Sequence, residues 1–144
     1  MSKAVFALAK RVDSRILFLR GQKIILDSDL AALYGVEVKH LNQQIKRNRK
    51  RFPGDFLFRI SAREFEILRS QIVTSSDGHG GRRYLPHAFT EHGAIMAATV
   101  LNSERAIQMS IFVVRAFVRM RRVLSTNRQI VVKLGGARAS HREP

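Results

Sequence analysis

The chain has 144 residues, no cysteine and a formal net charge of +15, with 26 lysines and arginines against 11 acidic residues. The lack of cysteine excludes a disulfide framework and thiolate chemistry. So large a positive charge attracts polyanions, which makes nucleic acid the partner we expect first and an anionic membrane surface the second. Charged residues interrupt every apolar stretch well before the roughly 20 residues that cross a bilayer, so we expect no membrane span.

The chain begins with a segment of weak pattern. Residues 1–14 are expected to form a loosely ordered lead segment. Two β-prone runs follow, at residues 16–19 and 24–26, and they flank a short turn that contains Arg20 and Gly21. This arrangement predicts a β-hairpin.

Two helices are predicted after the hairpin. Asp27 and Ser28 are good N-cap residues for a helix that starts near Asp29, and Gly35 is expected to end it. A second helix is predicted from about Glu37 to Arg49, because Phe-Pro-Gly follows and stops it.

The middle of the chain mixes strand, helix and loop signals. Residues 55–60, DFLFRI, are typical of a strand. The sequence SARE then matches a capping box, with Ser61 as the N-cap and Glu64 bonding back to it. Residues 71–86 are polar and glycine-rich at their centre, which predicts a mobile loop or hairpin tip.

Two further helices complete the predicted fold. Thr90 and Glu91 should open a helix to about residue 101, as cap and first-turn acid. Asn102 or Ser103 should cap a last long helix. We therefore expect an α+β fold: a small, mostly helical domain with a helix-turn-helix-like pair, short β-hairpins and a long C-terminal core helix. The expected divisions are a lead segment at 1–14, a DNA-binding domain at 15–124 and a helical extension and tail at 125–144.

The two helices around Gly35 fit a helix-turn-helix. Such a unit needs a small residue in its first helix, a glycine with positive φ in the turn, and apolar residues on the inner side of its second helix. Ala31 lies four residues before Gly35, and Val36, Leu41 and Ile45 supply the inner side. Short helix pairs with glycine turns are common, so this pattern alone does not establish DNA binding.

The outer side of the second helix is cationic and rich in amides. If Leu41 and Ile45 point inward, the exposed stripe has no carboxylate after Glu37. Glutamine can bond adenine, and arginine or lysine can bond guanine or phosphates. The competing interpretation is a solvated helix face, but such faces usually mix both signs of charge. The predicted DNA-contacting residues here are Lys39, His40, Asn42, Gln43, Lys46, Arg47, Arg49, Lys50 and Arg51.

Other clusters point less clearly to chemistry. His87, Glu91 and His92 lack the spacing of a zinc motif, and a proline precedes the first histidine, so we expect no metal. The glycine-rich GHGG segment lacks the ending of a nucleotide-binding loop, but the adjacent Arg82 and Arg83 are suited to a DNA backbone contact. Nothing resembles a catalytic centre, so we expect neither an enzyme nor a cofactor.

The last long helix, 103–124, is apolar on nearly all sides. It is predicted either to be a central core helix or to cover itself by forming a homodimer.

Three blocks of the sequence together resemble a known family. They are RGQKIILDSDLAALYGVEVKHLNQQIKRNRKRFPGDFLFRIS, RRYLPHAFTEHG and SERAIQMSIFVVRAFVRMR. Their order and spacing are similar to the phage-type ORF-six N-terminal domain, a relative of the KilA-N and Bro-N DNA-binding domains, over roughly residues 15–124. RFPGDFLF and FTEHG are the most specific pieces.

The resemblance implies a DNA-binding regulator of phages, prophages or bacteria. By matched motif it implies DNA contacts from Lys39 to Arg51, with the loop of Arg82 and Arg83 as a second contact. We expect a cytoplasmic, nucleoid-associated transcriptional regulator. The alternatives are an antirepressor-like module that captures another regulatory protein, and a binder of RNA or general polyanions. Such domains often precede a C-terminal domain, so a chain ending soon after Leu134 is expected to be either a stand-alone regulator or a fragment.

Overall fold

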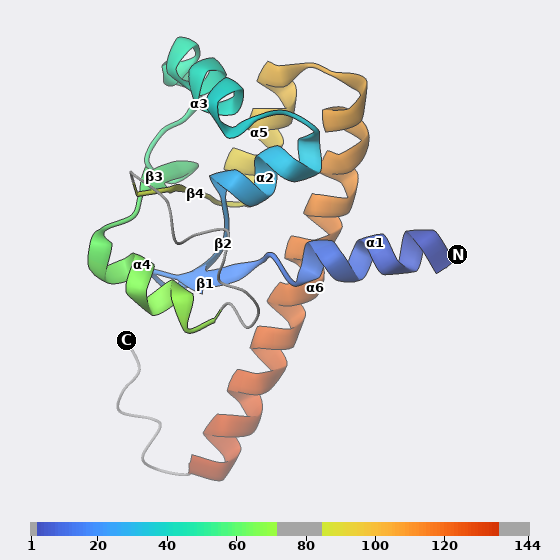
Figure 1. Ribbon diagram of the computed structural model, residues 1–144. Helices are drawn as coiled ribbons and strands as arrows, with labels where there is room; N and C mark the ends of the chain where they lie inside the picture. Colours follow the sequence, from blue (N-terminus) through green and yellow to red (C-terminus); the bar gives the residue numbers. More distant parts are fainter. Residues whose placement is uncertain (1–2, 72–84, 136–144) are drawn as a thin grey trace.

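The computed structural model describes residues 3–71 and 85–135, with side chains as far as Arg121, and it has a mixed α+β fold (Figure 1). The elements are, in chain order, α1 (Lys3–Asp13), β1 (Leu17–Leu19), β2 (Gln22–Leu26), α2 (Asp27–Tyr34), α3 (Val38–Arg47), the short 3-10 helix η1 (Arg49–Arg51), β3 (Leu57–Arg59), α4 (Ala62–Arg69), β4 (His87–Phe89), α5 (Glu91–Leu101) and α6 (Glu104–Gly135). The predicted fold class is confirmed.

The first two strands form the predicted hairpin. Leu17 pairs with Ile24 and Leu19 with Gln22. The two turn residues, Arg20 and Gly21, both have positive φ, at 55° and 76°. Two consecutive positive φ angles are what a tight two-residue hairpin turn requires.

The four described strands form one antiparallel sheet in the order β1-β2-β4-β3. Strand β4 lies in its interior, where Phe89 is opposite both Ile25 of β2 and Leu57 of β3. Sequence analysis did not predict this strand. Most of the predicted loop, residues 71–86, lies outside the described residues.

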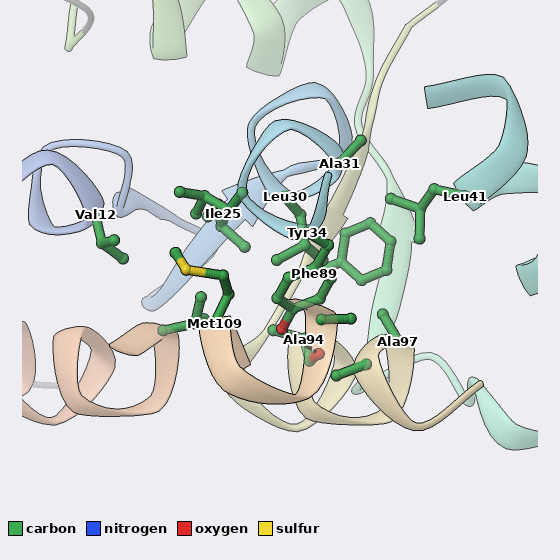
Figure 2. Close-up of a cluster of buried hydrophobic side chains, with 14 of the residues drawn as sticks. Val12, Ile25, Leu30, Ala31, Tyr34, Leu41, Phe89, Ala94, Ala97 and Met109 are labelled. Carbon is green, nitrogen blue, oxygen red and sulfur yellow. Dashed lines mark hydrogen bonds between the residues drawn. The ribbon is translucent and has the colours of Figure 1, made fainter. Parts of the chain in front are cut away.

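Both faces of the sheet are covered. In β2, Ile24 and Leu26 belong to a small cluster with Leu68 of α4, whereas Ile25 belongs to the main core. This alternation follows from the two-residue period of a strand. The main core lies between the sheet and helices α2, α5 and α6, with Tyr34, Phe89 and Met109 near its centre (Figure 2).

The N-terminal segment is a helix and not the loosely ordered lead that we expected. Helix α1 packs against α6 (Figure 1), and Val12 is fully buried between them. Arg119 of α6 donates to both carboxylate oxygens of Asp13, at 2.7 Å for the shortest contact. The expectation was wrong because this helix is stabilised by contacts more than 100 residues away, which local pattern does not reveal.

The start of α2 also differs from the prediction. The helix begins at Asp27 with Leu26 in the N-cap position, and no side chain caps it. The fully buried Asp27 carboxylate instead accepts a hydrogen bond from the backbone N–H of His87, at 3.2 Å. The residue predicted as a cap therefore joins α2 to β4.

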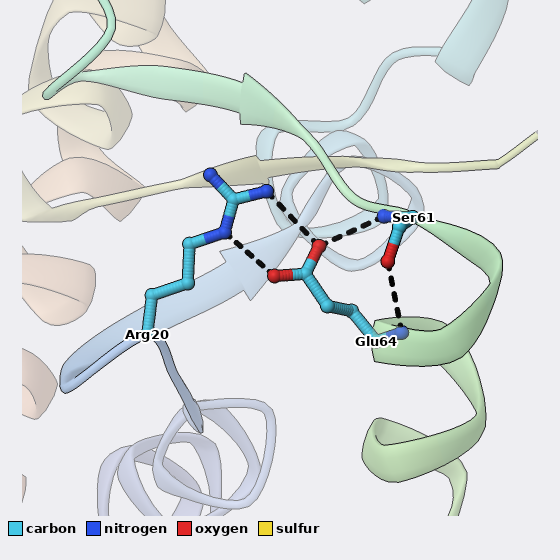
Figure 3. A network of polar contacts seen from close by, with 3 residues as sticks. All are labelled: Arg20, Ser61 and Glu64. Atoms are coloured by element: carbon cyan, nitrogen blue, oxygen red, sulfur yellow. Dashed lines mark hydrogen bonds and ion pairs between the residues drawn. The ribbon is translucent and has the colours of Figure 1, made fainter.

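The predicted caps of α4 and α5 are confirmed. Ser61 and Glu64 form a reciprocal capping box at the start of α4. Arg20 donates to both oxygens of the Glu64 carboxylate, at 2.6 and 3.0 Å (Figure 3). Hydrogen bonds from Arg20 and from the Ser61 backbone lower the pKa of Glu64 to about 2. Thr90 caps α5 by accepting from the N–H of Gly93.

Helix α6 is a core helix on one side only. The Ser103 hydroxyl accepts from the N–H of Ala106, as predicted for a cap. The buried face comprises Ala106, Met109, Val113, Ala116 and Phe117. Ile107 and Ile111, on the opposite side, are 50% and 49% exposed. The helix continues to Gly135, which confirms the predicted extension.

Candidate nucleic-acid interface

The turn between α2 and α3 needs its glycine for two reasons. Gly35 has a φ of 73°, in the left-handed region that favours glycine, and the N–H of Val36 bonds to the Ala31 carbonyl at 3.0 Å. A Cβ on Gly35 would also lie 2.6 Å from the Arg105 side chain. Arg105 occupies this space because its Nε donates to the Leu33 carbonyl, at 3.1 Å.

Helix α2 is fixed beneath this turn by Tyr34. Its ring is buried in the core (Figure 2), and its hydroxyl donates to the Ala94 carbonyl of α5, at 2.8 Å. Burial raises the pKa of the Tyr34 hydroxyl well above its usual value. Helix α2 therefore forms a rigid base on which α3 rests.

Helix α3 has the predicted inner face. Leu41 is 0% exposed and Ile45 is 6% exposed, and both belong to the main core. Val38 is half-buried and packs against the same core. The i, i+3, i+7 spacing therefore fixes the rotation of α3 about its own axis.

The predicted outer face of α3 is exposed to solvent. Its exposed residues are Lys39, His40, Gln43, Lys46 and Arg47, and η1 adds Arg49, Lys50 and Arg51. Asn42, which we also predicted as a contact, is half-buried on the flank of the helix that faces β3. Arg82 and Arg83 lie outside the described residues.

The basic turn η1 is attached to the core at its far end. Asn48 ends α3 by donating from its side chain to the Gln44 carbonyl, at 2.8 Å. Phe52 then enters the core and packs edge-to-face on Phe89, with ring centroids 6.5 Å apart. The cations of η1 are thus held beside α3.

The six lysines and arginines of α3 and η1 form no ion pair with any acidic residue that the structure describes. We call these six residues the open cations: Lys39, Lys46, Arg47, Arg49, Lys50 and Arg51. Several arginines elsewhere in the described domain are instead neutralised by carboxylates of distant residues. These paired arginines are Arg15 with Asp29, Arg20 with Glu64, Arg119 with Asp13 and Arg121 with Glu91.

The segments RFPGDFLF and FTEHG contact each other directly. The Phe56 carbonyl accepts from the N–H of Thr90 at 3.1 Å, and the Thr90 hydroxyl donates to the Asp55 carbonyl at 2.9 Å. A Cβ on Gly93 would lie only 1.9 Å from the Phe56 oxygen. This contact fixes the chain that leaves η1 to the start of α5.

The histidines and acids around α5 have structural neighbours. His92 stacks on Phe56 with ring centroids 5.6 Å apart, and Glu91 pairs with Arg121. Within residues 3–71 and 85–121, no group of three histidine or acidic side chains is placed to hold a metal ion. None of the helices in the described part of the chain is both long and apolar enough to cross a bilayer.

One cation beside the interface was missed by sequence analysis. Arg59 is exposed at the end of β3, on the same side of the strand as Leu57. The signal was present, because alternation along DFLFRI puts residues 57 and 59 on one face. Its closeness to α3 depends on the position of β3 in the sheet, which the sequence did not reveal.

These features define a mixed α+β domain whose helix pair presents a basic second helix. The chain belongs to the ORF6N domain family, a phage-associated family whose model matches residues 14–100. The resemblance found from the sequence is thereby confirmed, although the matched region ends within α5 and leaves α6 outside. Comparison with curated proteins and with solved structures found no significant match.

Proposed function

We propose that this chain is a sequence-specific double-stranded DNA-binding protein, acting as a phage- or prophage-type transcriptional regulator. The observation that carries the proposal is the open cations, which lie on a rigidly mounted helix and turn without acidic partners among the described residues. Cations that the fold does not neutralise remain available to phosphates.

The dimensions of α3 suit the major groove. A helix with its side chains is about 10–12 Å across and the groove is about 12 Å wide, so the ten residues of α3, about 15 Å long, can lie in it. Gln43, at the middle of the exposed stripe, can bond adenine in two places, and Arg47, one turn later, can bond guanine O6 and N7. Lys39 and the η1 cations lie toward the ends of the helix, where phosphates would pass.

We also propose that the protein is not an enzyme and needs no cofactor. The acids in the described residues support this proposal, because Asp13, Asp29, Glu64, Glu66 and Glu91 pair with arginines.

The proposal is tested by duplex binding at increasing salt. If about five phosphates are neutralised, the logarithm of the binding constant should fall against that of the salt concentration with a slope of about −4 or steeper. Competition with RNA and heparin separates duplex DNA from general polyanions. Undetectable duplex binding, or binding that salt does not weaken, would contradict the proposal.

A second proposal concerns the exposed face of α6. Ile107, Ile111, Val114 and Val118 follow one another at spacings of four, three and four residues, the spacing of a coiled-coil seam. The two isoleucines are half-exposed, and the two valines are half-buried. We propose that this stripe pairs with the same stripe of a second copy, which would present two α3 helices to DNA.

The competing role for the stripe is capture of another regulator, as in an antirepressor. Changing Ile107 and Ile111 to serine should convert a dimer to a monomer in sedimentation equilibrium without unfolding it. A wild-type chain that is monomeric at all concentrations would contradict the dimer. Regulatory activity that survives charge reversal of Arg47 and Lys50 but not the serine changes would favour the antirepressor.

A further inference from the structure

A groove of about 540 Å³ lies between α3 and the end of the sheet where β3 pairs with β4. This is within the size range of sites that hold a small molecule, and it is large enough for one nucleotide unit of a strand. In Figure 1, α3 lies above β3 and β4. Its apolar floor includes Ile45, Phe52 and Leu57.

The wall on the helix side is built from one flank of α3 and η1. Asn42 and Lys46, which lie one turn apart on one side of α3, line it together with Arg49 of η1. This flank adjoins the outward stripe, because Lys46 belongs to both. The groove is therefore continuous with the proposed major-groove surface.

The wall on the strand side comes from two paired residues. Arg59 of β3 is opposite His87 of β4, and its guanidinium lies 3.5 Å from the imidazole Nε2. Both residues line the groove. Arg59 forms no ion pair with a described acid, so the guanidinium N–H donors that do not face His87 remain available.

Among the described residues, three cations and no acidic side chain line this groove. None of the three forms an ion pair with an acid that the structure describes. Cations without a facing carboxylate favour an anionic ligand, because charge-assisted hydrogen bonds to a phosphate are strong.

We propose that this groove holds the sugar–phosphate backbone of one DNA strand while α3 occupies the adjacent major groove. Arg59 binds a phosphate from the strand side, and Lys46 and Arg49 bind from the helix side. The inference rests on the proposed function and deepens it, because it adds a contact from the sheet that fixes how α3 is oriented on the duplex.

The test compares two exposed arginines, neither of which forms an ion pair with a described acid. Arg59→Ala and Arg63→Ala each remove one positive charge, but Arg63 lies on α4, outside the groove. Affinity is measured by fluorescence anisotropy on a labelled duplex of about 20 base pairs, two helical turns, with the sequence taken from a random-pool selection. Arg59→Ala should weaken binding about tenfold on all duplexes and reduce the salt slope by about one. Arg63→Ala should weaken binding by less than about twofold.

Position is then tested by single methylphosphonate substitutions, each of which neutralises one phosphate of the duplex. At one position, the methylphosphonate should weaken duplex binding by the wild type but not by Arg59→Ala, because the neutralised phosphate and the missing arginine remove the same contact. The groove assignment would be overturned if Arg59→Ala and Arg63→Ala weakened binding equally. It would also be overturned if no methylphosphonate position weakened binding by the wild type while leaving binding by Arg59→Ala unchanged. If the wild type bound no duplex at all, the proposed function would fail first, and the two failures are therefore distinguishable. Unchanged melting temperatures would show that both variants fold.

Discussion

The paired arginines and the open cations have the same charge but different surroundings. Arg119 meets Asp13 across 106 residues of sequence, and Arg20 meets Glu64 across 44. The open cations fall within 13 consecutive positions, and none has a described acidic partner. Long-range pairs join elements of the fold, whereas a local cluster without acids leaves a field directed outward.

The difference teaches that net charge alone does not locate an interface. The value of +15 counts both groups equally. Only the paired arginines are assigned to the fold by their contacts, so the open cations are the ones we assign to DNA. Changes to the open cations should therefore affect DNA affinity, and changes to the paired arginines should affect stability.

The largest effect is expected from a change that disrupts the fold on which both groups of cations depend. Gly93→Ala would put a methyl carbon 1.9 Å from the Phe56 carbonyl oxygen, a backbone atom that cannot rotate away. We expect a loss of roughly 3 kcal/mol or more in the free energy of unfolding, measured by urea denaturation, with DNA binding lost in parallel. In the control, Gly54→Ala meets nothing within 4 Å and should change stability by less than about 1 kcal/mol. Similar stability in the two variants would contradict the tight contact.

The second effect should appear in affinity alone. Arg47→Glu reverses one open cation on the exposed stripe of α3. We expect duplex binding to weaken by about 30-fold or more, with no change in melting temperature. Arg63→Glu makes the same change of charge on α4 and should weaken binding far less. Equal losses of duplex affinity in the two variants would mean that only net charge matters, and would contradict the special role of the open cations.

The third effect should appear in stability alone. Asp13→Ala removes the carboxylate that neutralises Arg119 and joins α1 to α6. For a partly exposed pair we expect a loss of about 1 kcal/mol in the free energy of unfolding. DNA affinity should not fall, because a positive charge is released rather than removed. The control, Asp55→Ala, removes a carboxylate that forms no ion pair with a described residue. It should lower the free energy of unfolding by less than Asp13→Ala does.

The smallest effect is a pH dependence. The pKa of Glu64 is lowered to about 2 in the folded state, so its contribution is present above the ordinary pKa near 4.5 and is lost as pH falls toward 2. The melting temperature of the wild type should therefore exceed that of Glu64→Gln at pH 5, and the gap should close by pH 2. Glu66→Gln, at a far more exposed residue, should show almost no gap. A gap that widened on acidification would contradict the ion pair.

Local chemistry predicted much of this molecule. The Arg20-Gly21 turn, the Ser61 capping box and the Thr90 cap each depend on neighbours within a few residues, and all are present. The inner face of α3 followed from the 3.6-residue period alone, with Leu41 and Ile45 buried as expected.

The predictions that failed depend on distant partners. Helix α1 is held by α6, and the three-residue strand β4 exists because β2 and β3 flank it. Asp27 has the local signature of a cap, but its carboxylate bonds to His87, 60 residues away. Arg59 was missed as a candidate contact for the same reason, since its place beside α3 is set by the order of the strands.

The salt dependence of duplex binding in two double variants tests the central claim most directly. Arg47→Gln with Lys50→Gln removes two open cations, and Arg119→Gln with Arg121→Gln removes two paired arginines, so both lose the same net charge. We predict that the first makes the log–log slope shallower by about two and that the second leaves it unchanged. Equal changes of slope in both double variants would contradict the account.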